Sequence, residues 1–167
     1  SIDNSTIDSL LKLCTEFPNV CYPMLGLHPC SVNDDFTKEL EKLDAVFDTN
    51  NFIAIGETGI DLHWNKSTLD KQIEAFKIQI SWAKERNLPL VIHARNAFDE
   101  IFKDLATADV NTLNRVFPCL SGNQQPANQI SSYQCFPLGI GGVLPRTNSC
   151  LDKATETTPL QHLTLQT

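Results

Sequence analysis

The chain has 167 residues, of which 41% are hydrophobic and 20% are charged, which allows one domain with a substantial core and leaves little room for two. Its formal charge of −7 excludes a protein that holds nucleic acid on a broad basic surface, because such binding needs many lysines and arginines on one face. No segment reaches the roughly 18 apolar residues of a membrane span. We predict a single domain over residues 1–167 that does not bind a membrane.

The six cysteines are scattered without a Cys-x-x-Cys pair, so their spacing predicts neither a zinc knuckle nor a redox motif. We interpret them as reduced thiols, with a set of extracellular disulfides as the alternative. Residues 1–17 lack the basic start and the unbroken apolar core of a signal peptide. The sequence therefore predicts a cytoplasmic location.

Helical and apolar segments alternate along the chain after an opening helical stretch. Helical patterns occupy residues 36–50, 67–87 and 97–107, and weaker ones follow residues 119 and 141. Six short apolar runs predict strands buried on both faces, because each run is too short for a helix and too continuously apolar for a half-exposed strand. These runs span residues 20–27, 52–56, 88–93, 115–117, 136–141 and 163–165.

The helix predicted over residues 67–87 has the clearest pattern. Ser67 is its predicted N-cap, and Asp70 follows in the first turn. Apolar residues at spacings of three and four predict one stripe that packs against a sheet: Leu69, Ile73, Phe76, Ile80 and Ala83.

Strands that alternate with helices at this pitch predict parallel strands with right-handed crossovers, an α/β fold. A closed eight-stranded barrel needs about 200 residues or more. We therefore predict a TIM-type β/α barrel that is incomplete at both ends, with about six strand–helix units. An open doubly wound sheet is the alternative, but its G-x-G-x-x-G phosphate loop is missing from the sequence.

Polar residues follow the apolar runs, where ligands of parallel α/β folds bind. His28, Glu57 with Asp61, and His93 with Arg95 stand at these positions, as do Cys119 and Ser121. Imidazole and carboxylate together suit zinc, manganese or iron, whereas carboxylates alone can hold magnesium. The sequence therefore predicts a metal and anion site at this edge of the sheet.

Glu57 directly follows the apolar run "FIAIG" and lies between Gly56 and Gly59. A buried carboxylate is costly unless a positive group meets it. Glu57 therefore either reaches solvent, binds a cation, or forms a plain ion pair with Arg95. The other candidates also have structural alternatives, since His28 can cap a turn and Asp61 can be a turn residue.

Taken together, the motifs resemble the TatD-like metal-dependent deoxyribonucleases, a branch of the amidohydrolase-type barrels. The matching stretches occur in the family's order and span nearly the whole chain: "GLHP" at 26–29, "IGETGID" at 55–61, "LPLVIHARNAF" at 88–98, "CLSG" at 119–122, "LGIGG" at 138–142 and "PLQHLTLQT" at 159–167.

The resemblance implies a β/α barrel with divalent ions (Mg, Mn or Zn) at its mouth, and hydrolysis of DNA phosphodiesters by metal-activated water. By motif match, Glu57 and His93 fall on metal ligands. His28 and Arg95 fall on positions that bind substrate phosphate, and Asp61 falls on a residue that supports a ligand from behind.

Four metal-site positions of the family are not matched. The family's His-x-His pair belongs to a strand that would precede Ser1, and Pro118 stands where the family has a further histidine. Gln166 and Thr167 stand where the last family motif reads Glu-Thr-Asp, so its aspartate is absent. A catalytic zinc site usually takes three protein ligands, so we expect weak metal binding.

The leading hypothesis is a metal-dependent hydrolase that acts on DNA. A barrel that has lost catalysis and acts as a binding or scaffold protein is the alternative, motivated by Pro118 and Gln166. A third hypothesis is a small-molecule amidohydrolase or lactonase, because the same metal site can polarise a carbonyl group.

Overall fold

Six strands lie side by side in the order in which they occur in the chain. A computed structural model describes residues 2–108, 113, 116–120, 138–140 and 163–165, and within these residues the sheet order is β1-β2-β3-β4-β5-β6. Every neighbouring pair is parallel. The strands are β1 (Met24–Leu25), β2 (Ala54–Asp61), β3 (Leu90–Arg95), β4 (Val116–Leu120), β5 (Leu138–Ile140) and β6 (Leu163–Leu165).

This strand order decides between the two predicted topologies. A doubly wound sheet reverses its strand order at a switch point, whereas a β/α barrel places each strand beside its predecessor. The uninterrupted order is that of a β/α barrel wall. The α/β barrel fold class is therefore confirmed, while the boundaries of a single domain over residues 1–167 stay a prediction.

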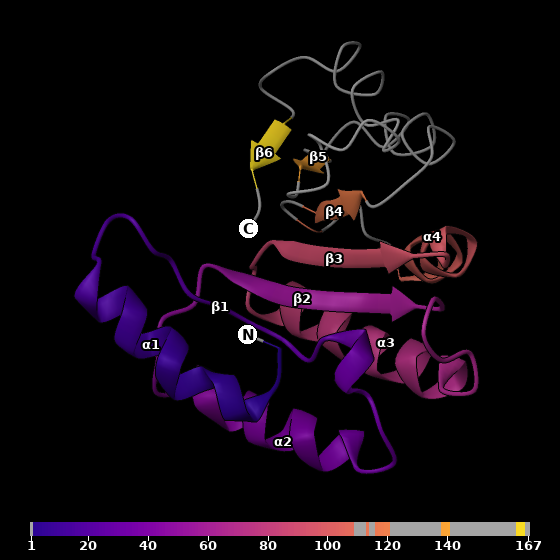
Figure 1. Cartoon of the computed structure of the whole chain (residues 1–167), viewed down its shortest axis with the longest axis horizontal. Helices are drawn as coiled ribbons and strands as arrows, with labels where there is room; N and C mark the ends of the chain where they lie inside the picture. The colour runs from indigo at the N-terminus through magenta and orange to yellow at the C-terminus, as the bar shows by residue number, and fades with distance from the viewer. Residues whose placement is uncertain (1, 109–112, 114–115, 121–137, 141–162, 166–167) are drawn as a thin grey trace.

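The helices pack on the outside of this wall. They are α1 (Ile7–Glu16), α2 (Phe36–Phe47), α3 (Leu69–Glu85) and α4 (Phe98–Thr107), with short 3-10 turns η1 (Asn4–Thr6) and η2 (Pro29–Ser31). Helix α3 contacts β2, α4 contacts β2 and β3, and α2 lies against α3 (Figure 1). The predicted weaker helices after residues 119 and 141 lie outside the described residues.

The core lies between the strands and these helices. The predicted apolar stripe of α3 is confirmed, since Phe76, Ile80 and Ala83 are buried while Leu69 and Ile73 pack against the core from its margin. The predicted N-cap is wrong by one residue: Thr68 is the N-cap. Because the hydroxyl and backbone amide of Ser67 both donate to Asn65 Oδ1, Ser67 belongs to the preceding turn.

Strand β2 is longer than its apolar run predicts. It continues beyond Gly56 to Asp61, and its register against β3 shifts between Ile55 and Thr58. Glu57 therefore lies within the strand at this irregularity, not after the strand end. His93 likewise lies inside β3, opposite Gly59.

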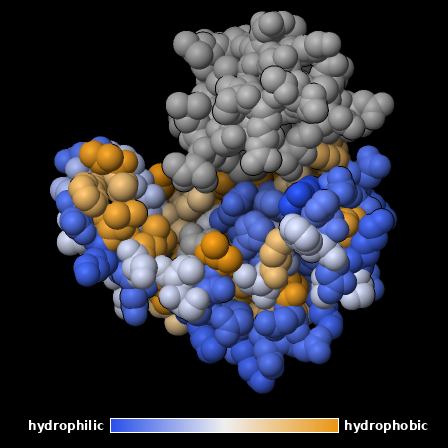
Figure 2. Space-filling model, viewed as in Figure 1, coloured by the Kyte–Doolittle hydropathy of each residue, from blue (hydrophilic) through white to orange (hydrophobic). Residues whose placement is uncertain are grey.

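One surface of the molecule is conspicuously apolar. Figure 2 shows hydrophobic residues gathered over α1, and Leu13, Phe17 and Val20 at its carboxyl end are 46%, 46% and 76% exposed. None of the helices among the described residues has the length and apolarity that crossing a bilayer requires.

Candidate metal centre

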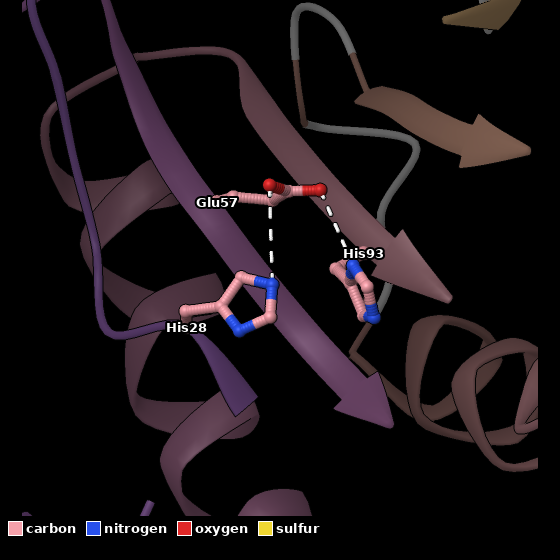
Figure 3. A group of neighbouring side chains, drawn as sticks. All are labelled: His28, Glu57 and His93. Atoms are coloured by element: carbon pink, nitrogen blue, oxygen red, sulfur yellow. Dashed lines mark hydrogen bonds and ion pairs between the residues drawn. The ribbon is translucent and has the colours of Figure 1, made fainter. Parts of the chain in front are cut away.

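Three consecutive strand–helix units bring His28, Glu57 and His93 together. His28 lies three residues beyond the end of β1, where its backbone amide donates to the carbonyl of Ile2, and the other two residues lie within β2 and β3. Glu57 Oε1 lies 3.3 Å from His93 Nδ1, and Glu57 Oε2 lies 4.0 Å from His28 Nε2. Figure 3 shows the carboxylate facing both imidazole rings. The side chains are 15–28% exposed, so the site is half-buried but open to solvent.

Glycine at position 59 lets the two strands that carry this cluster approach each other. Gly59 pairs with His93 across the β2–β3 ladder. Its φ is +135°, and a Cβ atom built there would lie 2.1 Å from the His93 carbonyl oxygen. A side chain at this position would therefore push β3, and His93 with it, away from Glu57.

Asp61 fixes the orientation of the His93 ring. Its side chain is 3% exposed, and Oδ2 lies 2.8 Å from His93 Nε2. Oδ1 accepts from the backbone amide of His63. Because an ionised carboxylate can only accept hydrogen bonds, His93 Nε2 must carry the hydrogen.

The consequence appears at the other ring nitrogen. In a neutral imidazole with its hydrogen on Nε2, Nδ1 presents a lone pair. That lone pair faces Glu57 Oε1 across 3.3 Å, an arrangement that is stable only if a proton or a cation lies between them. Carboxylate, histidine and metal in a row is the usual support of a metal-bound histidine in proteins.

The electrostatics of the metal-free protein agree with this arrangement. Burial lowers the pKa of His93, but hydrogen bonds and charges from Glu57 and Asp61 outweigh burial and raise the pKa above its ordinary 6.5. Burial acts to raise the pKa of Asp61, yet hydrogen bonds from the His63 backbone, from His93 and from Cys30 lower it overall. A proton on His93 therefore occupies the position that a cation would take.

The dimensions also fit a metal ion. Ligand atoms about 2.1 Å from a tetrahedral zinc ion lie about 3.4 Å apart, and the His93 Nδ1 to Glu57 Oε1 distance is 3.3 Å. One ligand atom from each of His28, Glu57 and His93 lies within 4.8 Å of the others. Imidazole nitrogen with carboxylate oxygen is a donor set for zinc or manganese.

His28 differs from His93 in which ring nitrogen faces Glu57: in His28 it is Nε2, which carries the hydrogen, and in His93 it is Nδ1. The Nδ1 atom of His28 accepts a hydrogen bond of 3.1 Å from the Cys30 backbone amide, so the neutral ring carries its hydrogen on Nε2, which points to Glu57. Burial, reinforced by the neighbouring His93, lowers the pKa of His28 below 6.5. Neutral His28 therefore presents an N–H donor at the mouth of the cluster, which suits an anionic oxygen better than a cation.

Arg95 lies two residues beyond His93 and pairs with Asp61 in the ladder. Its guanidinium carbon lies 5.5 Å from the centroid of the Trp64 ring. This cation–π contact holds the positive charge at the same edge as the cluster.

Two residues that the sequence interpretation missed hold the cluster from behind. Gln79 accepts from the Leu27 amide (2.8 Å) and donates to the Leu27 carbonyl (3.3 Å). Gln72 does the same for Asp61, at 2.8 and 3.2 Å. Both glutamines are buried on α3. They are seven residues apart and therefore lie on the same face of the helix. Their place on the apolar stripe of the predicted helix was the available signal.

For two other residues named from the sequence, the structure gives the backbone position. Pro118 and Cys119 lie on β4, with backbones paired to Ile92 and His93. Ser121 and Gln166 lie outside the described residues.

Comparison with known proteins decides the family. The profile of the TatD related DNases matches residues 1–167. The chain belongs to the TatD family. The resemblance seen in its motifs is thereby confirmed.

Curated TatD relatives are considerably longer than this chain. A protein of Bacillus subtilis named "Uncharacterized metal-dependent hydrolase YabD" is 31% identical over 147 residues, which cover 88% of this chain and 57% of the relative. A protein of Pectobacterium carotovorum named "3'-5' ssDNA/RNA exonuclease TatD" is 30% identical over 131 residues, 78% of this chain and 48% of the relative. This TatD-family chain therefore spans about half the length of these relatives.

Solved structures share the fold. The TatD homologue YjjV of Escherichia coli superposes with a TM-score of 0.83 at 25% identity, covering 100% of this chain and 64% of that one. A TatD family hydrolase of Entamoeba histolytica gives 0.82 at 17% identity, covering 99% and 57%.

Proposed function

We propose that this TatD-family chain belongs to a metal-dependent hydrolase that cleaves phosphodiester bonds of DNA. The observation that carries the proposal is the 3.3 Å approach of His93 Nδ1 to Glu57 Oε1, with Asp61 behind the ring. The names of relatives as a metal-dependent hydrolase and as an ssDNA/RNA exonuclease support the same reaction class. A cytoplasmic location stays a prediction from the sequence.

In this proposal Glu57 and His93 would hold a divalent ion (Mg, Mn or Zn). Such an ion supplies a Lewis acid for the phosphoryl group and makes water nucleophilic at neutral pH. Asp61 keeps the His93 ring in the tautomer that leaves Nδ1 free for the ion. The proposed role of His93 thus follows from which of its ring nitrogens carries the hydrogen.

Two further groups would bind the substrate. The Nε2–H of His28 points into the cluster and can donate to a non-bridging phosphate oxygen. Arg95 carries a planar guanidinium that binds phosphate in a bidentate manner. Together they would hold the phosphate diester beside the ion and stabilise charge that develops on its oxygens.

The test is the release of nucleotides from a single-stranded DNA oligonucleotide with added magnesium, manganese or zinc. We expect Glu57→Gln to lower the rate by more than about hundredfold, since losing a ligand exceeds the 10–100-fold effect of losing its supporting partner. Glu74→Gln on the exposed face of α3 is the matched control and should leave the rate unchanged. Equal rates for wild type and Glu57→Gln would remove the site from the reaction.

A binding protein without turnover is the second candidate. Proline has no side-chain ligand atom, and Pro118 stands where the resemblance implies a histidine, on the strand next to β3. Calorimetric titration with zinc or manganese separates the two candidates. The hydrolase requires saturable metal binding, whereas no saturable binding below millimolar metal would favour the binding protein without turnover.

A further inference from the structure

A cavity of about 270 Å³ adjoins the candidate metal centre. It lies between η2, which contributes Pro29 and Cys30, and the segment that joins β2 to α3, which contributes Trp64 and Thr68. Asp61 also lines the cavity, and the same Asp61 side chain holds His93. Asp61 therefore lies between the cavity and the proposed metal ligand His93.

The Asp61 and Gln72 side chains in this cavity are already hydrogen-bonded within the protein. Both oxygens of Asp61 accept hydrogen bonds, from the His63 amide and from His93 and Cys30. The Gln72 side chain is bonded to the Asp61 backbone and to Thr68. A ligand group that enters would find mainly apolar surface, including the Trp64 ring and Pro29.

Trp64 is exposed and yet held in place. Its side chain is 74% exposed, while the Arg95 guanidinium carbon lies 5.5 Å from the ring centroid. The His63 ring meets the indole edge-on, with centroids 4.7 Å apart and planes at 84°. Proteins that bind single-stranded nucleic acid stack its bases on aromatic side chains that lie beside positively charged groups.

We infer that Trp64 and this cavity form a subsite for a nucleobase of a single-stranded substrate. The inference rests on the proposed function, because it takes the phosphate of the same nucleotide to lie at Arg95 and His28. The Asp61 and Gln72 side chains are already hydrogen-bonded, so recognition comes mainly from stacking, which accepts any base with little preference. A duplex base is already stacked and is not available to the indole.

The experiment measures binding, not turnover. The full chain with magnesium is titrated with a phosphorothioate dT tetranucleotide, which resists cleavage, while tryptophan fluorescence is recorded. Stacking should quench Trp64 saturably. Trp64→Phe serves as the blank, because it leaves Trp82, which is 7% exposed, as the remaining tryptophan of the two in the sequence.

Affinities of the variants come from the anisotropy of the same oligonucleotide carrying a dye. Trp64→Leu should bind about tenfold more weakly, since one base–aromatic stack contributes on this scale, whereas Trp64→Phe keeps most of the affinity. Val20→Ala, at an equally exposed site away from the cavity, should match wild type. An abasic oligonucleotide of equal charge should bind to wild type and to Trp64→Leu with equal affinity.

Equal binding of the abasic and dT oligonucleotides, unchanged affinity of Trp64→Leu, or no quenching up to millimolar oligonucleotide would overturn the inference. These outcomes are distinct from failure of the proposed function. DNA cleavage with an unchanged KM in Trp64→Leu removes the subsite and keeps the hydrolase, and base-dependent quenching without cleavage does the reverse.

Discussion

His93 Nε2 lies 2.8 Å from Asp61 Oδ2, and this single contact determines what the opposite nitrogen of the ring can do. With the hydrogen held on Nε2, Nδ1 faces Glu57 with a lone pair when the ring is neutral and with a proton when it is charged. Asp61 is not among the groups proposed to hold the ion or the phosphate, but it sets the chemistry of the cluster.

Replacing Asp61 by asparagine tests this relationship. The amide keeps the shape of the side chain and loses its charge, so we expect the affinity for zinc to fall about 10–100-fold. In the metal-free variant the pKa of His93 should also fall, because one of the groups that raises it is gone. Calorimetry and NMR titration measure the two effects. Asp34→Asn, at an exposed position beside Lys71, is the control, and unchanged zinc affinity in Asp61→Asn would contradict the assignment.

The two imidazoles of the cluster should titrate on opposite sides of pH 6.5 in metal-free protein. The pKa of His93 is raised, so its contribution to stability is fully present below pH 6.5 and is lost as the pH rises through its folded-state pKa. The pKa of His28 is lowered, so its contribution is present above pH 6.5 and is lost as the pH falls through its folded-state pKa.

NMR titration with His28→Gln and His93→Gln for assignment checks this order. Urea unfolding should show that His93→Gln loses more stability below pH 6.5 than at pH 8, and a His93 that titrates below His28 would refute it. Protons compete with a cation for His93 Nδ1, so metal binding should also weaken as the pH falls.

The sequence predicts the outer wall of the site better than its interior. Period and apolarity suffice to place α3 and the strands, because both follow from burial. The same criterion ended β2 at Gly56, since the strand residues beyond it include Glu57, a charged residue that faces the cluster. No sequence pattern predicts the shift in strand register between Ile55 and Thr58.

Side-chain hydrogen bonds to the backbone were the other gap. Gln72 and Gln79 look like polar interruptions of an apolar stripe, yet each hydrogen-bonds to both the backbone amide and the carbonyl of one residue, Asp61 at the end of β2 and Leu27 just beyond β1. Such a partner is needed by backbone N–H and C=O groups that have no hydrogen bond to a neighbouring strand. Which groups these are is known only once the pairing of the strands is known.

Gln79→Met should show what this support contributes. Methionine fills a similar volume but leaves the buried amide and carbonyl of Leu27 without their partner, so we expect a loss of about 2–4 kcal/mol in the free energy of unfolding. Because Leu27 precedes His28, the NMR signals of that ring should shift as well. Urea denaturation measures the loss. Ser81→Ala on the exposed face of α3 is the control, and equal losses in the two variants would contradict the role of Gln79.

Cys30 should react slowly with alkylating reagents although it is exposed. Burial of its sulfur, together with the charge of Asp61 and a hydrogen bond to it, raises the pKa of the thiol from 9.0 to about 11. At pH 8 the thiolate fraction is then about 100-fold below that of an unperturbed thiol.

Peptide mass spectrometry after iodoacetamide treatment measures the rates at Cys30 and Cys21. We expect Cys30 to lag far behind and to accelerate in Asp61→Asn, whose loss of charge favours the thiolate. Rapid labelling of Cys30 at pH 8 in the native protein would show that Asp61 does not control it.

The order of the strands has a consequence for how the protein is made. His28, Glu57 and His93 come from three successive units and lie within the first 108 residues, so no contact among them has to wait for a distant part of the chain. During synthesis the nascent polypeptide can assemble this cluster while the ribosome is still adding β4 to β6.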